Sequence, residues 1–358
     1  MKQEKIGRRR SKLVCMTAFT LLVAATRSFA QIPMTSYNIG GSGGYSGVLV
    51  GGNPFGPTKP VTIDAVMIPL IVQIIKKDGT PVTFDPTAAD DCDSNISAAY
   101  SFEHSPLVVE SDLTFNGVSV GKAQYIDGFM QAEFWNAPHH DRSSYKNHLN
   151  WSFTSPVVLP VVLNAQNTIF QGTGCSEEAF VSADVFNPIM EGFIKLLQSE
   201  GVISPKKFVY FLMRSVATSG TNPPTTTNPT WGQHHAMAGS PVQTWARGAG
   251  GVITASHEIG EWMNDPLVTN PAPRWGYIGS IKNGCSGTFE VGDPLNGKSI
   301  PKITLSGIDY YVQELAFFSW FFDTESSWGA GGKYSSHGSF TGFSKPCVPG
   351  DPTSGGTN

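Results

Sequence analysis

The sequence predicts an α+β fold, in which a β-rich N-terminal region over residues 61–170 precedes a second domain over residues 171–345. Runs of β-branched residues separated by Asp-Gly and Asn-Gly pairs fill the first region, a pattern typical of strands joined by tight turns. In the second region an amphipathic helical pattern leads directly into a wholly apolar run, which indicates a central strand. We therefore expect a mixed β-sheet in the second region, packed on a helix.

Residues 1–30 have the three parts of a cleaved signal peptide. A basic start is followed by an apolar run over Leu13–Ala25, and small residues come just before Gln31. The consecutive arginines at residues 8–10 also permit twin-arginine export instead of the general secretory route. Either route predicts a secreted or extracytoplasmic protein.

The composition is that of a globular chain with little charge imbalance. The net charge is −4, from 24 basic and 28 acidic residues, which argues against a nucleic-acid partner. Hydrophobic residues make up 40% of the chain, enough for a sizeable core. Because no apolar run after the leader reaches the ~18 residues that span a bilayer, we also expect no membrane span.

Four cysteines remain after the leader: Cys92, Cys175, Cys285 and Cys347. An even number in an oxidising compartment predicts two disulfide bonds, with three possible connectivities. A four-cysteine zinc site is the alternative, although the sequence has no Cys-x-x-Cys pair to support it.

The N-terminal half is expected to be built mainly from strands. Residues 31–60 are rich in glycine, serine and proline and should form a flexible arm. A strand over Val61–Ile75 should turn at Asp78-Gly79 into a second strand. The remaining expected elements are a hairpin around Asn116-Gly117 with strand cores at residues 107–110 and 118–120, a helix over 125–134, and proline-containing edge strands at 149–153 and 156–163.

Helices and strands alternate in the second half. Residues 179–199 have the pattern of a long amphipathic helix, and residues 207–213 form the apolar strand that follows it. A polar loop over residues 217–230 comes before another short strand at 242–246 and could rim a cleft. The aromatic stretch over residues 308–322 is strand-like, and residues 346–358 are a C-terminal tail.

The helix expected around Ile253–Pro266 carries the residues with the clearest chemistry. His257 and Glu261 lie one turn apart, the spacing at which two side chains can bind one metal ion. Glu258 lies beside them, where it could act as the general base that activates a water molecule. This is the logic of H-E-x-x-H metallopeptidases, with glutamate in place of the second histidine. The alternative is an amphipathic helix with a solvated polar face.

A metal bound to one helix needs a further protein ligand. Glu290 and Asp293 follow the helix at the distance where H-E-x-x-H enzymes of the gluzincin kind take a downstream glutamate, supported by an aspartate. At least one of them is expected to be the third ligand, although both could belong to an ordinary acidic turn. His234 and His235, which follow the polar loop, could supply an extra ligand or polarise a substrate carbonyl.

Four separated elements resemble the phosphate-induced, EXORDIUM-like secreted family and its bacterial relatives. In order they are Ser256–Pro266, Trp275, Glu290–Asp293 and Tyr311–Gln313, within a matching region of about residues 205–322. The resemblance implies a secreted or cell-wall protein with a metallopeptidase-like helix. One departure is that Cys285 precedes Glu290, whereas the family has a cysteine just after the aspartate.

Together these patterns predict a zincin-like C-terminal domain that hydrolyses peptide bonds in a peptide or protein substrate. Zinc is the expected cofactor, but a site with one histidine and two carboxylates neutralises its charge, so manganese or calcium become competitive. The alternative function is that of a non-enzymatic cell-surface, matrix-binding or glycan-binding protein with a structural metal or none.

Overall fold

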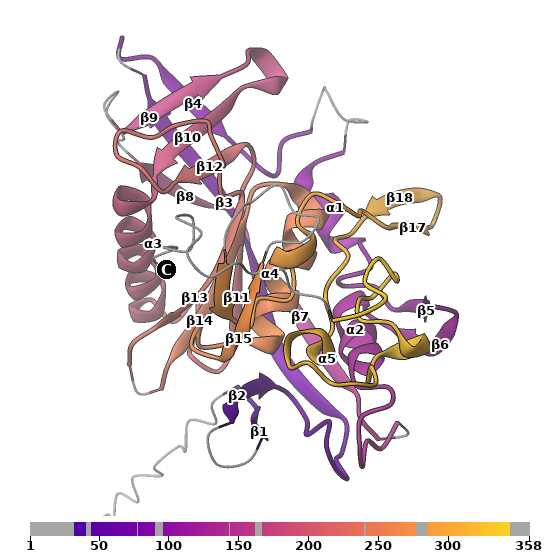
Figure 1. Cartoon of the computed structure of the whole chain (residues 1–358). Helices are drawn as coiled ribbons and strands as arrows, with labels where there is room; N and C mark the ends of the chain where they lie inside the picture. The colour runs from indigo at the N-terminus through magenta and orange to yellow at the C-terminus, as the bar shows by residue number, and fades with distance from the viewer. Residues whose placement is uncertain are drawn as a thin grey trace, which may run out of the picture.

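The computed structural model of the chain describes residues 32–40, 44–76, 78–89, 96–142, 144–161, 167–239, 241–276 and 285–343. Within these residues the fold is α+β, as the sequence predicts, with a large mixed sheet, several small sheets and few helices (Figure 1). The part of the chain that the structure describes has no helix long and apolar enough to cross a membrane.

The seven-stranded sheet is organised around β3, the long strand over Val61–Ile75. On one side of β3 the order is β11, β14 and β13. β11 is parallel to β3 and β14 is parallel to β11, whereas β13, at the edge, is antiparallel to β14. The other strands that pair with β3 are β7 and β8, both parallel, and β4, which is antiparallel. The bounds of these strands are Pro81–Phe84 (β4), Asn147–Phe153 (β7), Val157–Val161 (β8), Phe208–Leu212 (β11), Gly232–Met237 (β13) and Gln243–Gly248 (β14).

This sheet contains strands from both regions that the sequence separates near residue 170. β3 comes from the N-terminal region, and it pairs with β11 from the second region over five residues, from Phe208 to Leu212. The apolar strand predicted over residues 207–213 is therefore central in a mixed sheet, as expected. The helix of the second region that carries the predicted metal ligands accordingly packs on a sheet that the N-terminal region helps to build.

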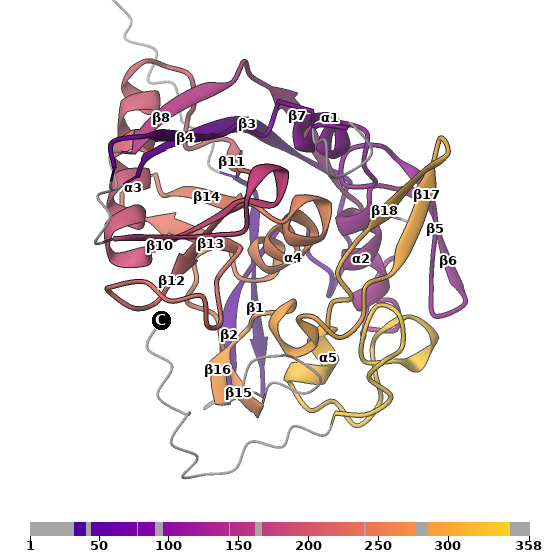
Figure 2. The ribbon, with the colours of Figure 1, turned by 90° about the horizontal axis from the view of Figure 1, so that it is seen from above.

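The middle of β3 is buried on both faces because the sheet separates two hydrophobic cores. Ile63, Ala65 and Met67 contact one core, whereas Val66 and Ile68 contact the other. This follows from the period of two along a strand. Figures 1 and 2 show α3 (Ala183–Ser199) on one face of the sheet and α4 (Gly251–Asn264) on the other.

The helix predicted over residues 179–199 begins later than expected. Residues Glu178–Ser182 form β10, because this segment pairs with β9 (Thr168–Gln171) and with β12 (Val216–Ser219) in a three-stranded sheet. α3 then follows and buries Phe186, Met190, Ile194 and Leu197 at helical spacing. Tertiary strand pairing thus overrides the local helical pattern at its first residues.

The expected arm over residues 31–60 contains an antiparallel hairpin, formed by β1 (Met34–Ile39) and β2 (Tyr45–Val50). The side chain of Asn270 joins β2 to the loop after α4, because it accepts a hydrogen bond from Val48 N–H (3.0 Å) and donates one to Val48 O (2.6 Å). Gly47 permits this approach, since a Cβ there would collide with Asn270.

The hairpin predicted around Asn116-Gly117 is present. Both turn residues have positive φ, 51° and 77°, as a two-residue hairpin turn requires. Its strands are β5 (Ser111–Phe115) and β6 (Val118–Ala123), so the first strand begins after the predicted core at residues 107–110. The predicted helix follows as α2 (Tyr125–Glu133).

The aromatic stretch over residues 308–322 is not one strand, as the sequence suggested. β18 ends at Tyr311, and Phe318–Phe321 form the short helix α5, whose aromatic rings pack in the core beside α4. The other elements are α1 (Ala98–Glu103), β15 (Pro271–Gly276), β16 (Cys285–Thr288), β17 (Lys302–Leu305), β18 (Ile308–Tyr311) and the 3₁₀ turns Gly174–Ser176, Asp293–Leu295 and Ala330–Gly332.

Of the four cysteines expected to form disulfides, Cys175 and Cys285 are each disulfide-bonded. Cys92 and Cys347 lie outside the described residues, as does the predicted leader. The pairing of the four cysteines therefore stays a prediction.

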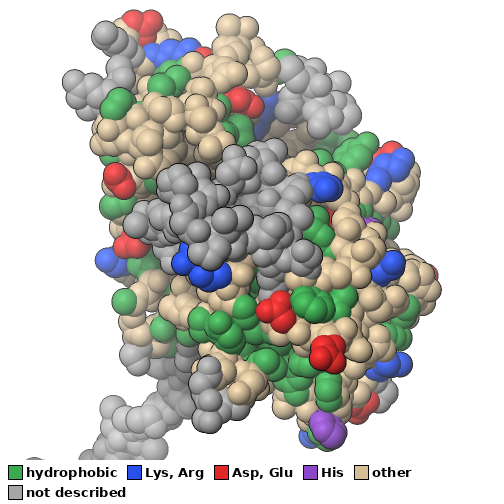
Figure 3. All heavy atoms as spheres, viewed as in Figure 1, with side chains coloured by type: hydrophobic (Ala, Val, Ile, Leu, Met, Phe, Trp, Pro, Cys, Tyr) green, Lys and Arg blue, Asp and Glu red, His purple; other side chains and the backbone are tan. Residues whose placement is uncertain are grey.

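Charged side chains are scattered over the face of the molecule shown in Figure 3. On the face shown in Figure 3, Lys and Arg side chains lie apart from one another among hydrophobic, acidic and other groups. This face has no gathered basic surface among its described residues.

Candidate metal centre

The three motif residues on α4 are buried, although all are polar. His257 is 8% exposed, and Glu258 and Glu261 are each 4% exposed. The opposite face of α4 places Ala255, Ile259 and other apolar side chains in the core, so the helix is buried from Ala255 onward. A solvated polar helix face, the alternative that the sequence left open, is therefore not what the structure forms.

A first group of potential ligands gathers around His257. Its Nε2 lies 3.1 Å from Oε1 of Glu261 and 3.7 Å from Oδ1 of Asp293. Ligand atoms held tetrahedrally at about 2.0–2.1 Å from a zinc ion lie about 3.3 Å from one another. The group formed by His257, Glu261 and Asp293 therefore has the spacing of a metal site, with its ligand atoms all within 4.8 Å of one another.

A second group gathers around His234 on the edge strand β13. Nδ1 of His234 lies 3.4 Å from Oε2 of Glu261 and 3.6 Å from Oε2 of Glu258. These three residues also fall within 4.8 Å of one another, and all are buried. β13 packs directly on α4, which explains how a residue far from the motif in sequence reaches it.

The structure separates the two predicted downstream candidates. Asp293 lies at His257, whereas Oε2 of Glu290 lies 3.6 Å from Nε2 of His234, on the ring nitrogen that faces away from the second group. Glu290 belongs to neither group of potential ligands. It lies on the far side of the His234 ring from the second group, and no hydrogen bond joins its Oε2 to Nε2 of His234.

The two neighbouring histidines that the sequence could not rank have different surroundings. Successive side chains of a strand point to opposite faces of the sheet, so His234 faces α4 and His235 faces away from it. The ring of His235 stacks on Trp245 at a centroid distance of 4.6 Å. Burial, with Arg247 nearby, lowers the pKa of His235 to about 3. His235 is thus a neutral packing residue.

The pKa shifts of the buried histidines follow from the several carboxylates around them. Burial lowers the pKa of His257, but Glu261 and the other carboxylates raise it more, to about 10. Burial also lowers the pKa of His234, and Glu290, Glu258 and Glu261 reverse the effect, so that it lies well above the ordinary value. Burial raises the pKa of Glu290 well above its usual range. Protons on these groups partly balance the charge that a cation would balance.

The side chains present fit a divalent cation. Nε2 of His234, Oε2 of Glu258 and Oε2 of Glu290 are buried without a hydrogen-bond partner among the described residues. Leaving a buried polar group unpaired costs about 1–3 kcal/mol, and more for a charged one. Imidazole and carboxylate donors suit zinc, and carboxylates also suit manganese.

A second set of residues, to which the sequence analysis gave no role in the site, supports the cluster. Gly292 N–H donates to Oε1 of Glu261 (3.3 Å), and Gln313 Nε2 donates to Gly292 O (2.9 Å). Gln313 N–H in turn donates to Oγ of Ser256 on α4 (2.8 Å). A Cβ at Gly292 would lie 2.7 Å from the His257 ring, so only glycine fits there without displacing the histidine. The motif Tyr311–Gln313 drew attention to Gln313, but it did not predict the contacts of Gln313 with Gly292 and Ser256.

Asp265, the acidic residue that directly follows α4, does not join either group. Its carboxylate accepts hydrogen bonds from Thr269 N–H (2.9 Å) and Asn270 N–H (3.0 Å). Burial raises its pKa to about 6, although these bonds oppose the shift. Asp265 therefore orders the loop that follows α4.

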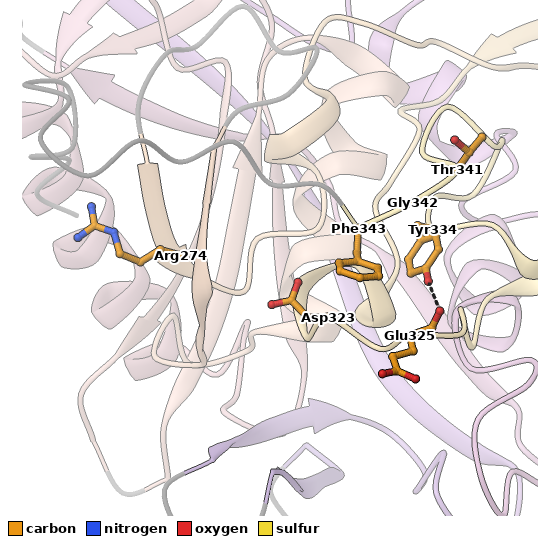
Figure 4. Close-up of a pocket in the computed structure, with 7 residues that line it drawn as sticks. All are labelled: Arg274, Asp323, Glu325, Tyr334, Thr341, Gly342 and Phe343. Carbon is orange, nitrogen blue, oxygen red and sulfur yellow. Dashed lines mark hydrogen bonds between the residues drawn. The ribbon is translucent and has the colours of Figure 1, made fainter.

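A cavity of about 170 Å³ reaches the cluster, with His257 and Glu258 both in its lining. Its other walls come mainly from the polar loop before β13, from α4 and from Gln313. A wider hollow of about 780 Å³ is lined instead by Arg274, Asp323, Glu325, Tyr334, Thr341, Gly342 and Phe343 (Figure 4). None of the predicted site residues lines this second hollow.

Comparison with protein-family models, with curated proteins and with solved structures finds no match for this chain. The EXORDIUM-like resemblance accordingly rests on its motif residues alone.

Proposed function

We propose that this chain is a secreted, zinc-dependent hydrolase of peptide bonds with a zincin-like domain. The observation that carries the proposal is that His257 and Glu258 line the same cavity, beside a buried group of potential metal ligands. A substrate group that enters the cavity would meet a metal site and a carboxylate together. The secreted location rests on the predicted leader, and N-terminal sequencing of exported protein that begins at Gln31 would support it.

In this proposal His257, Glu261 and Asp293 hold the ion. A divalent ion bound there supplies Lewis-acid chemistry and makes water more acidic. Glu258 accepts the proton from the attacking water, and its buried position, which raises its pKa, suits a general base that works near neutral pH. Because the group has one histidine and two carboxylates, manganese is a plausible substitute for zinc.

The edge strand supports a peptide or protein as the substrate. β13 is the last strand of the sheet, and its outer side has no strand partner among the described residues. Trp231 and Gly232, at its start, line the cavity together with His257. An extended peptide could pair with the free edge of β13 and pass its backbone over the cavity.

The burial of the ligands favours a second candidate, a non-enzymatic binding protein with a structural ion. Structural zinc sites are closed, whereas catalytic sites keep an open position. Glu261 is only 4% exposed, which fits a closed site, but the cavity at His257 and Glu258 fits an open one. Activity decides between the two.

The test is incubation of the purified chain with a peptide mixture, followed by mass spectrometry of the products. Zinc-loaded protein should cleave peptides, a chelator should stop cleavage, and added zinc should restore it. The Glu258→Gln variant, loaded in the same way, is the control for a contaminating protease. Cleavage that survives in this variant, or no cleavage by the metal-loaded protein, would contradict the hydrolase and favour the binding protein.

A further inference from the structure

The carboxylate of Glu261 lies between the two histidines, with a different oxygen directed to each. Oε1 lies 3.1 Å from Nε2 of His257, and Oε2 lies 3.4 Å from Nδ1 of His234. The two groups of potential ligands share Glu261 and no other residue. This is the arrangement of a carboxylate that bridges two sites.

One ion cannot satisfy both groups. An ion bound to His257, Glu261 and Asp293 leaves Oε2 of Glu258 buried and without a hydrogen-bond partner among the described residues. His234 is likewise left 3.6 Å from Glu258, beyond hydrogen-bonding distance. A group that is nine-tenths buried and unpartnered needs another occupant in the space that it faces.

The charges give the same result. Glu258, Glu261, Glu290 and Asp293 carry one negative charge each when ionised, and all four lie within 4 Å of His234 or His257. When both histidines bind as neutral ligands and all four carboxylates are ionised, one divalent cation balances half of this charge, and two balance all of it. Buried charges that are not balanced are strongly unfavourable.

We propose that the centre binds two divalent cations, one at His257 and Asp293 and one at His234 and Glu258, with Glu261 as the bridging ligand. The inference rests on the proposed metal-dependent function and assigns it to the class of two-ion hydrolases, in which a pair of ions lies roughly 3.5–4 Å apart. Glu258 holds the second ion through Oε2, and Oε1, which faces His257 at 3.9 Å, stays directed to the cavity side for proton transfer.

Glu290 has a defined part in this arrangement. Its Oε2 faces Nε2 of His234, the nitrogen opposite the one that faces Glu258 and Glu261. A carboxylate behind a metal-binding histidine sets the orientation and tautomer of the ring, and its loss typically weakens metal binding about 10–100-fold. If the 3.6 Å contact shortens to a hydrogen bond when the second ion binds, Glu290 becomes a positioning residue for His234, and Glu290→Gln should weaken the second ion without removing the first.

The test is calorimetric titration of metal-free protein with zinc, checked by elemental analysis. The wild-type chain should bind two ions, and His234→Ala and His257→Ala should each bind one. The control His235→Ala, on the opposite face of the same strand, should still bind two. With manganese as the probe, the electron paramagnetic resonance spectrum of the wild type should show a coupled pair, and each single-histidine variant should show an isolated ion.

If the wild type binds a single ion, the inference is overturned, whichever histidine variant no longer binds that ion. The absence of any bound ion in the wild type would also overturn it. If a histidine variant fails to fold, the stoichiometry and the manganese spectrum of the wild type still decide. Two bound ions without peptide cleavage would contradict the proposed hydrolase and leave the two-ion centre standing. Peptide cleavage with one bound ion would support the proposed hydrolase and contradict the two-ion centre.

Discussion

Oε1 of Glu261 lies 3.1 Å from Nε2 of His257, one helical turn before it on α4. Both side chains are buried, and each contributes to the unusual pKa of the other. Burial raises the pKa of Glu261, but the nearby His257 and His234 lower it more, so that the carboxylate stays ionised. In the proposed function a cation would take the place of the imidazolium proton beside this carboxylate.

Replacing Glu258 by Gln should lower the rate of peptide cleavage about 10²–10⁴-fold, because an amide cannot accept the proton from water. The ion at His257 should remain, since Glu261 and Asp293 are unchanged. Steady-state kinetics and metal analysis on the same preparation would check both statements. The control is Glu325→Gln in the separate hollow, which should cleave like the wild type. An unchanged rate in Glu258→Gln would remove the proposed base.

Replacing Gly292 by Ala should weaken metal binding about tenfold or more, because the added Cβ would lie 2.7 Å from the His257 ring and displace it. The backbone of Gly292, at φ −83° and ψ −34°, accepts alanine without strain. Competition with a chelator of known affinity measures the change. Gly287→Ala is the matched control, since its Cβ would have 3.8 Å to the nearest atom. Equal affinities for the two variants would show that the fit at His257 is not tight.

Replacing Ser256 by Ala should lower the free energy of unfolding by about 1–3 kcal/mol, because it leaves the buried N–H of Gln313 without its acceptor. Ser199→Ala provides the control. Both hydroxyls donate to the carbonyl three residues earlier, at Ile253 and Leu196. Ser199 is exposed, however, and accepts no hydrogen bond from a distant segment within the described residues. Urea unfolding of both variants measures the difference, and equal losses would assign the effect to the helix alone.

Replacing Asp127 by Asn should make stability less dependent on pH. Burial raises the pKa of Asp127 to about 7, although the hydrogen bond from Asn147 N–H opposes the shift. The folded chain therefore keeps a proton that the unfolded chain loses from about pH 4, so this group lowers stability as the pH rises toward 7. Between pH 4.5 and about 8, the free energy of unfolding of the variant should rise relative to that of the wild type by a few kcal/mol. A constant difference would contradict the raised pKa.

The local parts of the site could be predicted from the sequence, and the long-range parts could not. His257, Glu258 and Glu261 share one helix face because of their spacing alone. The choice between His234 and His235 depends on which face of β13 meets α4, and a shift of one residue in strand register would reverse it. The contacts of Gln313 and Gly292 depend on how the chain returns to α4 after the motif.

The fold shows the same division. The long apolar strand β3 has the bounds that its β-branched run predicts. The predicted turn at Asn116-Gly117 is also present, because these two residues readily adopt the positive φ angles that the turn needs. β10 has a helical pattern that pairing with β9 and β12 overrides. The aromatic rings of α5 would suit a strand equally well, and packing around Phe289 and Tyr37 favours the helix.

The metal content of the purified chain tests the central claim most directly. Protein exposed to zinc, freed of unbound ions and analysed for metal should contain stoichiometric zinc in the wild type. Glu261→Ala should contain almost none, because this residue belongs to both ligand groups. A wild-type chain that is fully folded and still binds no zinc or manganese would contradict the account.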